Sequence, residues 1–224
     1  MRRDQLIQLT FAVVLYLLGG AIVGVCLAPG LWLAQLAYRH SLLAAALALG
    51  VGYFLYGFSL LVVTAALHRG LGLDLVPGRH DFFSRECLRW VLASSLHLLV
   101  KVTFMDFLML SPALITYFRL LGGKLGEGVM INSKYIHDLS LLEVGDGAVI
   151  GGEAAISCHV AEKGQVLLAP IKIGKKCLIG QRAIIMPDVE IGDGAVVGAS
   201  AVVLKGTRIG PGETWVGIPA RRLD

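Results

Sequence analysis

The sequence predicts a chain of two unlike parts, in which apolar membrane helices are followed by a coil of short parallel β-strands. Two uncharged stretches, 6–28 and 41–67, stand in the first half. In the second half an apolar residue returns every six positions, at Ile173, Ile179, Ile185, Ile191, Val197, Val203, Ile209 and Trp215. The whole chain is 56% hydrophobic and 16% charged, with mean hydropathy +0.74, which is too apolar for an ordinary soluble domain.

The two uncharged stretches predict membrane-spanning helices. At about 1.5 Å per residue, each exceeds the roughly 30 Å hydrocarbon core of a bilayer. Pro29 and Gly30 are expected to end the first helix. The first run is too long for the apolar part of a signal peptide, so we expect it to be retained. A buried helical hairpin in a soluble protein is the alternative.

The basic residues predict the orientation of these helices. Arg2 and Arg3 precede the first stretch, and the second is followed by His68, Arg69, Arg79, Arg85 and Arg89, whereas the loop between holds Arg39 and His40. The positive-inside rule therefore places both termini and the C-terminal half on the cytoplasmic side of the inner membrane. The net charge of +4 and pI near 8.9 come largely from these flanking bases, which do not gather on one face as nucleic-acid binding would require.

The apolar stretch 87–121 is interrupted by His97, Lys101 and Asp106, which make a third span costly, and Pro112 adds a break. Interfacial or re-entrant helices are the better interpretation, with a third span left open. The three polar residues could line a lipid site or could reach to the interface as solvated side chains. We therefore predict a membrane domain over 1–121 and a second domain over 122–224.

The six-residue period belongs to neither an amphipathic helix nor a single alternating strand. A small or medium residue follows four positions after nearly every apolar anchor, at Cys177, Ala183, Val189, Ala195, Ala201 and Thr207, and Val144, Ile150 and Ile156 keep the same rule upstream. Three flat six-residue strands per turn would point the anchors into a triangular prism. Successive turns would then stack about 4.8 Å apart. A glycine after most anchors is expected to allow the tight corners.

The register slips between Ile156 and Ile173, which are seventeen rather than eighteen positions apart. The slip predicts a small loop near Glu162, Lys163 and Gly164. His159 stands three positions after the Ile156 anchor, so its side chain is expected to point outward from the prism.

This pattern resembles the hexapeptide-repeat acyltransferases over residues 122–224. The ending GIPARRL (217–223) is similar to that of the acetyltransferase members, and the stretch 135–160 is similar to a membrane-attached subgroup found at the end of some peptide synthetases and in polysaccharide and lipid modification. The resemblance implies a left-handed parallel β-helix and a homotrimer. It also implies that acyl-CoA lies between neighbouring prisms.

The resemblance also implies a histidine base that activates the acceptor directly, without a covalent enzyme intermediate. His159 matches that residue by register, and an imidazole with an ordinary pKa near 6.5 suits the task. An exposed structural histidine is the alternative. His137 could bind substrate or fill the first turn. Asp138 and Glu153 could orient a histidine or hold an acceptor amine, or could simply be solvated.

For acyl-CoA, the resemblance points to the late coils. The backbone of Gly198, Ala199 and Ser200 would lie along the ligand, and Lys205, Arg221 and Arg222 would lie near its phosphates. The three cations could instead be ordinary surface bases.

The four cysteines show neither CxxC pairing nor zinc-ligand spacing, so a reducing compartment without disulfides fits. Cys158 adjoins His159, but neighbouring residues of a strand face opposite sides, which disfavours a Cys–His nucleophilic pair.

The sequence therefore predicts a membrane-bound acyltransferase. It would move an acyl group, most simply acetyl from acetyl-CoA, to a hydroxyl or amine of a lipid-linked or amphiphilic acceptor. Two alternatives are a non-catalytic trimeric membrane scaffold and a metal lyase of the carbonic-anhydrase type. A lyase of that type needs three histidines around zinc, but only His137 and His159 stand in this half, so no metal is predicted.

Overall fold

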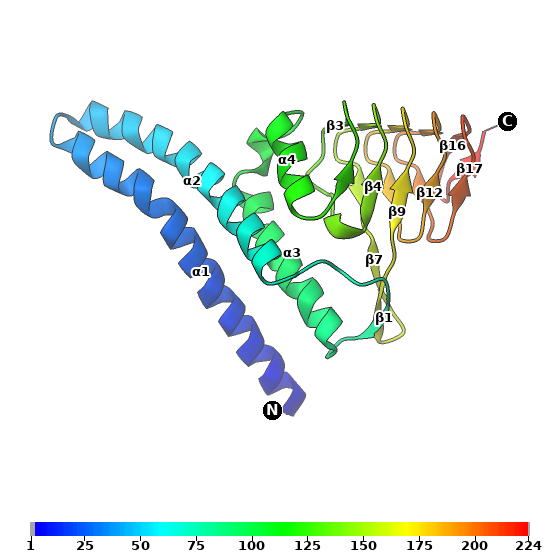
Figure 1. Cartoon of the computed structure of the whole chain (residues 1–224), viewed down its shortest axis with the longest axis horizontal. Coiled ribbons are helices and arrows are strands. Elements are labelled where there is room, and N and C mark those ends of the chain that lie inside the picture. Colours follow the sequence, from blue (N-terminus) through cyan, green and yellow to red (C-terminus); the bar gives the residue numbers. More distant parts are fainter. Residues whose placement is uncertain (1–2, 224) are drawn as a thin grey trace. The chain divides into compact units, whose positions relative to one another are not determined.

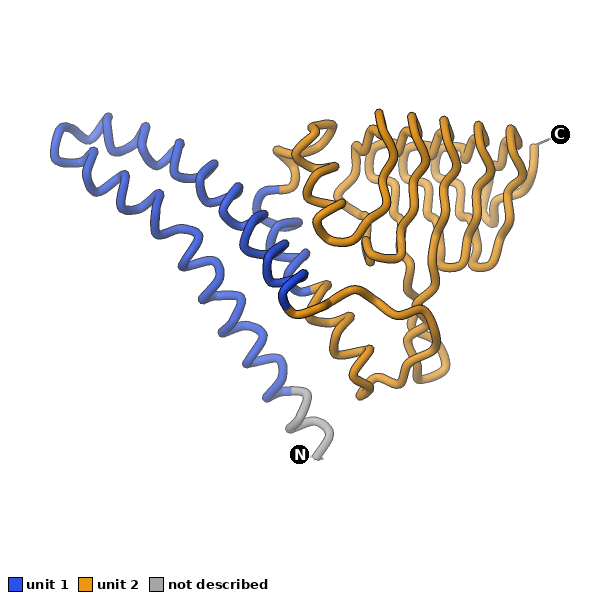
Figure 2. Tube along the Cα trace, in the orientation of Figure 1, with its two compact units in different colours: residues 1–70, 95–104 blue, residues 71–94, 105–224 orange. Residues whose placement is uncertain are grey.

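The structure, a computed structural model, describes residues 3–223 (Figure 1); Arg2, one of the bases that predict the orientation, lies outside this range. The chain forms two compact units (Figure 2). Residues up to Gly70 form the first unit together with 95–104, and residues 71–94 form the second together with those from 105 onward. Helix α3 (Arg85–Thr103) contributes to both units.

The first unit is built on two long helices, α1 (Arg3–Tyr38) and α2 (Leu42–Gly70), which pack against each other. Among the described residues, these two helices are long and apolar enough to cross a membrane. Insertion in a membrane remains a prediction.

The expected helix end at Pro29 and Gly30 is wrong, because α1 continues through both residues to Tyr38. Gly30 instead lies where α1 meets α2. A Cβ atom on Gly30 would stand 2.8 Å from the Cα of Gly52 and 2.9 Å from its carbonyl oxygen. The two glycines therefore allow the helix backbones to touch, which a pattern read along one segment cannot reveal.

The second unit is dominated by a parallel β-helix whose strands form three faces (Figure 1). One face contains β2 (Lys124–Leu125), β4 (Leu142–Val144), β9 (Ile171–Ile173), β12 (Glu190–Ile191) and β15 (Arg208–Ile209). The second contains β3 (Met130–Ile131), β5 (Val149–Ile150), β10 (Leu178–Ile179), β13 (Val196–Val197) and β16 (Thr214–Val216), with β17 (Arg221–Arg222) antiparallel at its edge. The third contains β6 (Ala155–Ile156), β11 (Ile184–Ile185) and β14 (Val202–Val203). The left-handed sense of the coil stays a prediction.

The predicted inward direction of the anchors is confirmed by burial for those from Ile173 to Ile209, but not for the last one, Trp215, which is only half-buried at the end of the rod. Ile179, Ile185 and Val203 are completely buried, and so are the small partners Ala183 and Ala201. Burying one such aliphatic side chain contributes roughly 1.5–3 kcal/mol. Because each anchor pairs with the anchor of the next turn, as Ile179 does with Val197, these contributions extend along the whole rod.

The glycine that follows most anchors has a different role from the predicted one. A Cβ atom on Gly180 would lie 2.5 Å from the backbone nitrogen of Ala199 on the next turn. The left-handed corner itself comes two positions later, at Arg182, with φ of 58°. The glycine is therefore needed because adjacent turns approach closely, and the corner conformation is adopted by other residues.

One segment that the sequence assigned to the membrane domain, a short helix after residue 111, packs on the first turn of the β-helix. Helix α4 (Pro112–Leu120) starts at Pro112 after the Ser111 cap, following the 3₁₀ turn Met105–Phe107. Arg119 of α4 donates to the carbonyl oxygens of Leu125 and Gly126 on the first turn, at 3.1 and 2.9 Å. The compact units divide the chain differently from the predicted boundary at 121. That boundary and the interfacial placement of 87–121 stay predictions.

The predicted loop after Ile156 is a β-hairpin of β7 (His159–Glu162) and β8 (Gln165–Leu168) that projects from the coils (Figure 1). Lys163 and Gly164 turn it, both with positive φ, as a two-residue hairpin requires. A strand that the sequence did not predict, β1 (Gly78–Asp81), pairs antiparallel with β8. We call β1, β8 and β7 the side sheet.

Candidate active site

His159 is the first residue of β7, at the point where the chain leaves the β-helix. Its side chain is 27% exposed, whereas the neighbouring Cys158 is completely buried. This alternation agrees with the expectation that the two side chains face opposite ways. His159 therefore lies outside the packed interior of the rod while remaining partly covered.

Asp138 holds the imidazole from one side. Its Oδ2 lies 2.6 Å from His159 Nδ1, and its side chain is only 1% exposed. An ionised carboxylate only accepts hydrogen bonds, so the proton of a neutral imidazole sits on Nδ1 and leaves Nε2 as an acceptor. Ser157 Oγ, 3.1 Å from the same Nδ1 and from the His159 carbonyl oxygen, completes the contacts on that side.

The backbone brings Asp138 to this position through an irregular stretch of the first turn. The amide of His137 donates to the carbonyl of Ile156, and the amide of Ile156 donates to that of Tyr135, both at 2.9 Å. Asp138 then adopts a left-handed φ of 57° and precedes the 3₁₀ turn Leu139–Leu141. The segment between β3 and β4, which does not follow the six-residue repeat, therefore runs beside β6, next to the start of the hairpin.

Two aromatic rings flank His159. The His137 ring lies 6.1 Å away between centroids, nearly perpendicular at 80°. The Trp90 ring of α3 lies 4.8 Å away, and its Nε1 donates to Asp138 Oδ1 at 2.9 Å. The structure thus brings together three predicted candidates, His159, His137 and Asp138, and adds Trp90. The sequence carries no signal that links Trp90 to the repeat.

The other predicted residues lie elsewhere on the rod. Glu153, with φ of 57°, occupies an exposed corner, where its carboxylate bonds Arg182 at 2.7 Å. Ser200, with φ of 58°, forms another corner beside Gly198 and Ala199. Arg222 on β17 pairs with Glu213 at 2.9 Å, and Arg221 is exposed. No described contact joins any of these residues to His159.

Lys205 is connected to the side sheet. Its ammonium pairs with Glu162, at the far end of β7 from His159, and Glu162 also accepts from Arg79 of β1 at 2.9 Å. Three residues of extended chain place His159 and Glu162 roughly 10 Å apart along the strand. A ligand that used Lys205 as a phosphate partner would have to share it with this carboxylate.

Hydrogen bonds from Lys205 and Arg79 lower the pKa of Glu162. A lowered pKa adds stability above the ordinary carboxyl value of about 4.3, and this stability is lost as the pH falls through the folded-state value. We expect Glu162→Gln to lower the melting temperature at pH 7, with the difference from wild type shrinking toward pH 3. Thermal unfolding across this range checks it; an equal difference at both pH values would contradict it.

The Cys158 thiol has a pKa well above its ordinary value because it is buried and close to the Asp138 carboxylate. A protonated, covered thiol is a poor nucleophile. We expect N-ethylmaleimide to modify Cys158 at least about tenfold more slowly in the folded protein than in denaturant, as peptide mass spectrometry would measure. Cys158→Ala identifies the peptide, and rapid labelling of the folded protein would contradict the expectation.

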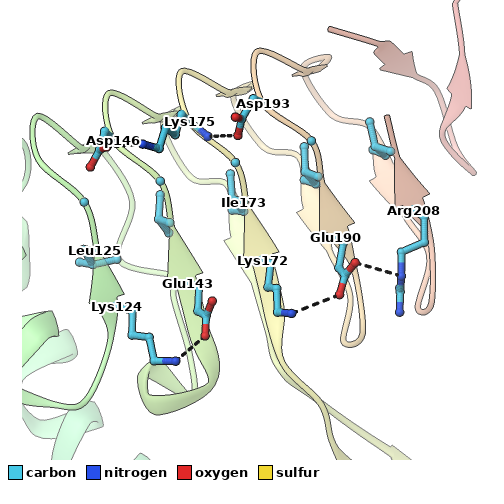
Figure 3. A pocket seen from close by; sticks show the side chains of 17 residues that line it. Lys124, Leu125, Glu143, Asp146, Lys172, Ile173, Lys175, Glu190, Asp193 and Arg208 are labelled. Atoms are coloured by element: carbon cyan, nitrogen blue, oxygen red, sulfur yellow. Dashed lines mark hydrogen bonds and ion pairs between the residues drawn. The ribbon is translucent and has the colours of Figure 1, made fainter. Parts of the chain in front are cut away.

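A broad groove of about 700 Å³ lies on a different face of the rod, along β2, β4, β9, β12 and β15 (Figure 3). Charges of alternating sign run across it, and they pair with one another: Lys124 with Glu143 at 2.6 Å, Lys172 with Glu190 at 3.5 Å, and Glu190 with Arg208 at 3.5 Å. None of the predicted site residues lines this groove. Its charges are already balanced within the face, so we do not assign the chemistry to it.

Among residues 9–223, whose side chains the structure describes, no group of three His, Cys, Asp or Glu side chains is placed to hold a metal ion.

Of the comparisons with known proteins, the family-model match lies within the coil. Residues 170–205 match the family model of the bacterial transferase hexapeptide, described as six repeats. The delta-poly-L-ornithine synthetase of Acinetobacter baumannii (strain AB307-0294) is 26% identical over 162 residues, which are 72% of this chain. The chain spans only 12% of the length of that synthetase.

Two of the similar solved structures illustrate the fold. A hexapeptide-repeat acetyltransferase of Vibrio cholerae O1 biovar eltor, complexed with acetyl coenzyme A, matches with a TM-score of 0.50 at 20% identity, over 69% of this chain and 96% of the other. A maltose O-acetyltransferase of Clostridium difficile 630 matches with a TM-score of 0.48 at 21% identity, over 67% and 94%. Residues 170–205 therefore carry the bacterial transferase hexapeptide repeat, on a β-helix with the fold of the hexapeptide-repeat acetyltransferases.

Proposed function

We propose that this protein is a membrane-bound acyltransferase that moves an acetyl group from acetyl-CoA to a hydroxyl or amine, with His159 as general base. The observation that carries the proposal is the bond between His159 Nδ1 and the buried Asp138 carboxylate. It leaves Nε2 able to accept a proton on a partly exposed ring beside the rod. The family match and the acetyltransferase fold support the choice of an acyl-CoA donor.

In the proposed reaction, His159 Nε2 removes the proton from the acceptor while the acceptor oxygen or nitrogen attacks the thioester carbonyl carbon. Asp138 stabilises the imidazolium that forms. The carbon–sulfur bond then breaks, and Nε2 returns the proton to the departing sulfur. The products are the acetylated acceptor and the CoA thiol, with no covalent enzyme intermediate. Positioning of this kind of base is worth about 10²–10⁴ in rate.

We propose that the acceptor is lipid-linked or amphiphilic, because the same chain carries two helices apolar enough to cross a membrane. The β-helix would lie on the cytoplasmic side, where CoA is found, and three chains would form a homotrimer with acyl-CoA between them. Gly198, Ala199, Ser200, Lys205, Arg221 and Arg222 remain the proposed CoA contacts, with Lys205 and Arg222 exchanging or sharing their carboxylate partners.

The test uses the full chain in nanodiscs, supplied with radiolabelled acetyl-CoA and a total lipid extract from its source cells. We expect label to enter the organic phase with stoichiometric release of CoA thiol, and mass spectrometry to identify the product as an acetylated lipid. Transfer only to water-soluble hydroxyl or amino compounds would refute the lipid-linked acceptor. Absence of transfer to either class, with CoA bound, would refute the enzyme and favour the trimeric scaffold.

A further inference from the structure

Trp90 makes two contacts with the proposed base although it lies outside the β-helix. Its indole Nε1 donates to Asp138 Oδ1 at 2.9 Å, and its ring lies 4.8 Å from the His159 ring at 59°. Asp138 is therefore held between two donors, with Oδ1 bonded to Trp90 and Oδ2 to His159 Nδ1.

The Asp138 carboxylate depends on both bonds. Its side chain is 1% exposed, so water cannot replace a missing donor without entering the site. A buried carboxylate with an empty oxygen is costly, and it is free to turn about its terminal torsion. The indole fixes the carboxylate plane, and that plane in turn sets the direction of the His159 imidazole.

The side sheet explains how a residue so distant in sequence reaches this position. Leu168 of β8 pairs with His159 on one side and with Gly78 of β1 on the other. After β1 the chain turns at once into α3, where the Ser84 hydroxyl accepts from the amide of Cys87 at 3.1 Å. Trp90 follows within the first two turns of the helix, inside the same compact unit as the rod. The side sheet therefore ties the start of α3 to the strand that begins with His159.

We propose that Trp90 is a positioning residue for the His159 base, acting through Asp138 by its indole N–H and on the imidazole by its ring. This inference rests on the proposed function. At metal sites, removing a group that orients a metal-binding side chain typically costs 10–100-fold in metal affinity or activity, and we expect an effect at the lower end of that range here. Trp90→Phe keeps an aromatic ring and removes the donor, so we expect kcat to fall about tenfold while the KM for acetyl-CoA stays within about twofold.

A spectroscopic measurement tests the contact without depending on activity. The chain has three tryptophans, so indole-¹⁵N labelling of the full protein in detergent gives three side-chain signals, and Trp90→Phe identifies one. In Asp138→Asn the Trp90 indole proton should shift upfield because the amide is a weaker acceptor, while the signals of Trp32 and Trp215 stay in place. An unmoved Trp90 signal would overturn the inference even if acetyl transfer is demonstrated.

A double-mutant cycle tests the role. If Trp90 acts through Asp138, Trp90→Phe should cost about tenfold in kcat alone but under about twofold in the Asp138→Asn background. Equal losses in both backgrounds would overturn the positioning role.

Trp215→Phe is the matched control, because it removes another indole-to-carboxylate bond, 2.9 Å to Glu213, and it should lower stability without lowering kcat. If wild type transfers no acetyl group, the proposed function fails, while the indole signals still decide whether the contact exists.

Discussion

Replacing His159 by glutamine lowers kcat for acetyl transfer by about 10²–10⁴-fold and leaves the dissociation constant of CoA within about twofold of wild type. The reason is that glutamine keeps the polar volume but cannot accept and return a proton at the position of Nε2. Asp138 cannot substitute as the base because it is buried on the Nδ1 side of the ring, away from Nε2. Initial rates with acetyl-CoA and calorimetric CoA binding measure the two quantities separately.

The control for this variant is His80→Gln. His80 belongs to β1 of the side sheet, and its ring nitrogen contacts the carbonyl oxygen of Val76 at 2.8 Å, so the variant makes the same substitution without altering His159, Asp138 or Trp90. Its kcat should stay close to wild type. A His159→Gln enzyme that keeps kcat within about threefold of wild type would remove His159 as the base.

Substituting alanine at Gly151 destabilises the β-helix by about 1–3 kcal/mol, while the same substitution at Gly152 changes stability by less than about 0.5 kcal/mol. A Cβ atom on Gly151 would lie 2.7 Å from the backbone nitrogen of Gln181 and 2.9 Å from the carbonyl oxygen of Ile179, both on the next turn. Neither backbone atom can move without separating the turns. A Cβ atom on Gly152 meets nothing closer than 3.5 Å.

Denaturant unfolding of the two alanine variants, monitored by circular dichroism of the β-helix, measures the difference. The two glycines are adjacent in sequence, so the two variants have the same composition and differ only in the position of the added methyl group. Equal destabilisation by both substitutions would show that close stacking of the turns does not determine the glycine positions.

The six-residue repeat could be predicted from the sequence because every turn must bury an apolar side chain at the same position. Ile179 and Val197 occupy equivalent places in consecutive turns, so the same requirement recurs along the chain and produces a period. The loop after Ile156 was predicted for the same reason, since a hairpin that leaves the rod changes the number of residues between one anchor and the next. His159 was a candidate because its position can be counted from the Ile156 anchor of the repeat. Asp138 was a candidate because it is a carboxylate close to the start of the repeat.

The features that the sequence did not reveal depend on contacts between distant segments. Gly30 looks like a helix end until it is placed against Gly52. Strand β1 has no alternating apolar pattern that would predict it. It is held by backbone pairing with β8, which the sequence does not reveal. Trp90 reads as one more aromatic residue in an apolar helix, and only the fold places it against Asp138.

A structure of the full chain with CoA bound is the most direct test of the account. The account predicts that the CoA thiol lies beside His159, with the sulfur roughly 3–5 Å from Nε2 and the Asp138 bond intact. A thiol that instead lies in the charged groove of β2, β4, β9, β12 and β15, far from the imidazole, would contradict it.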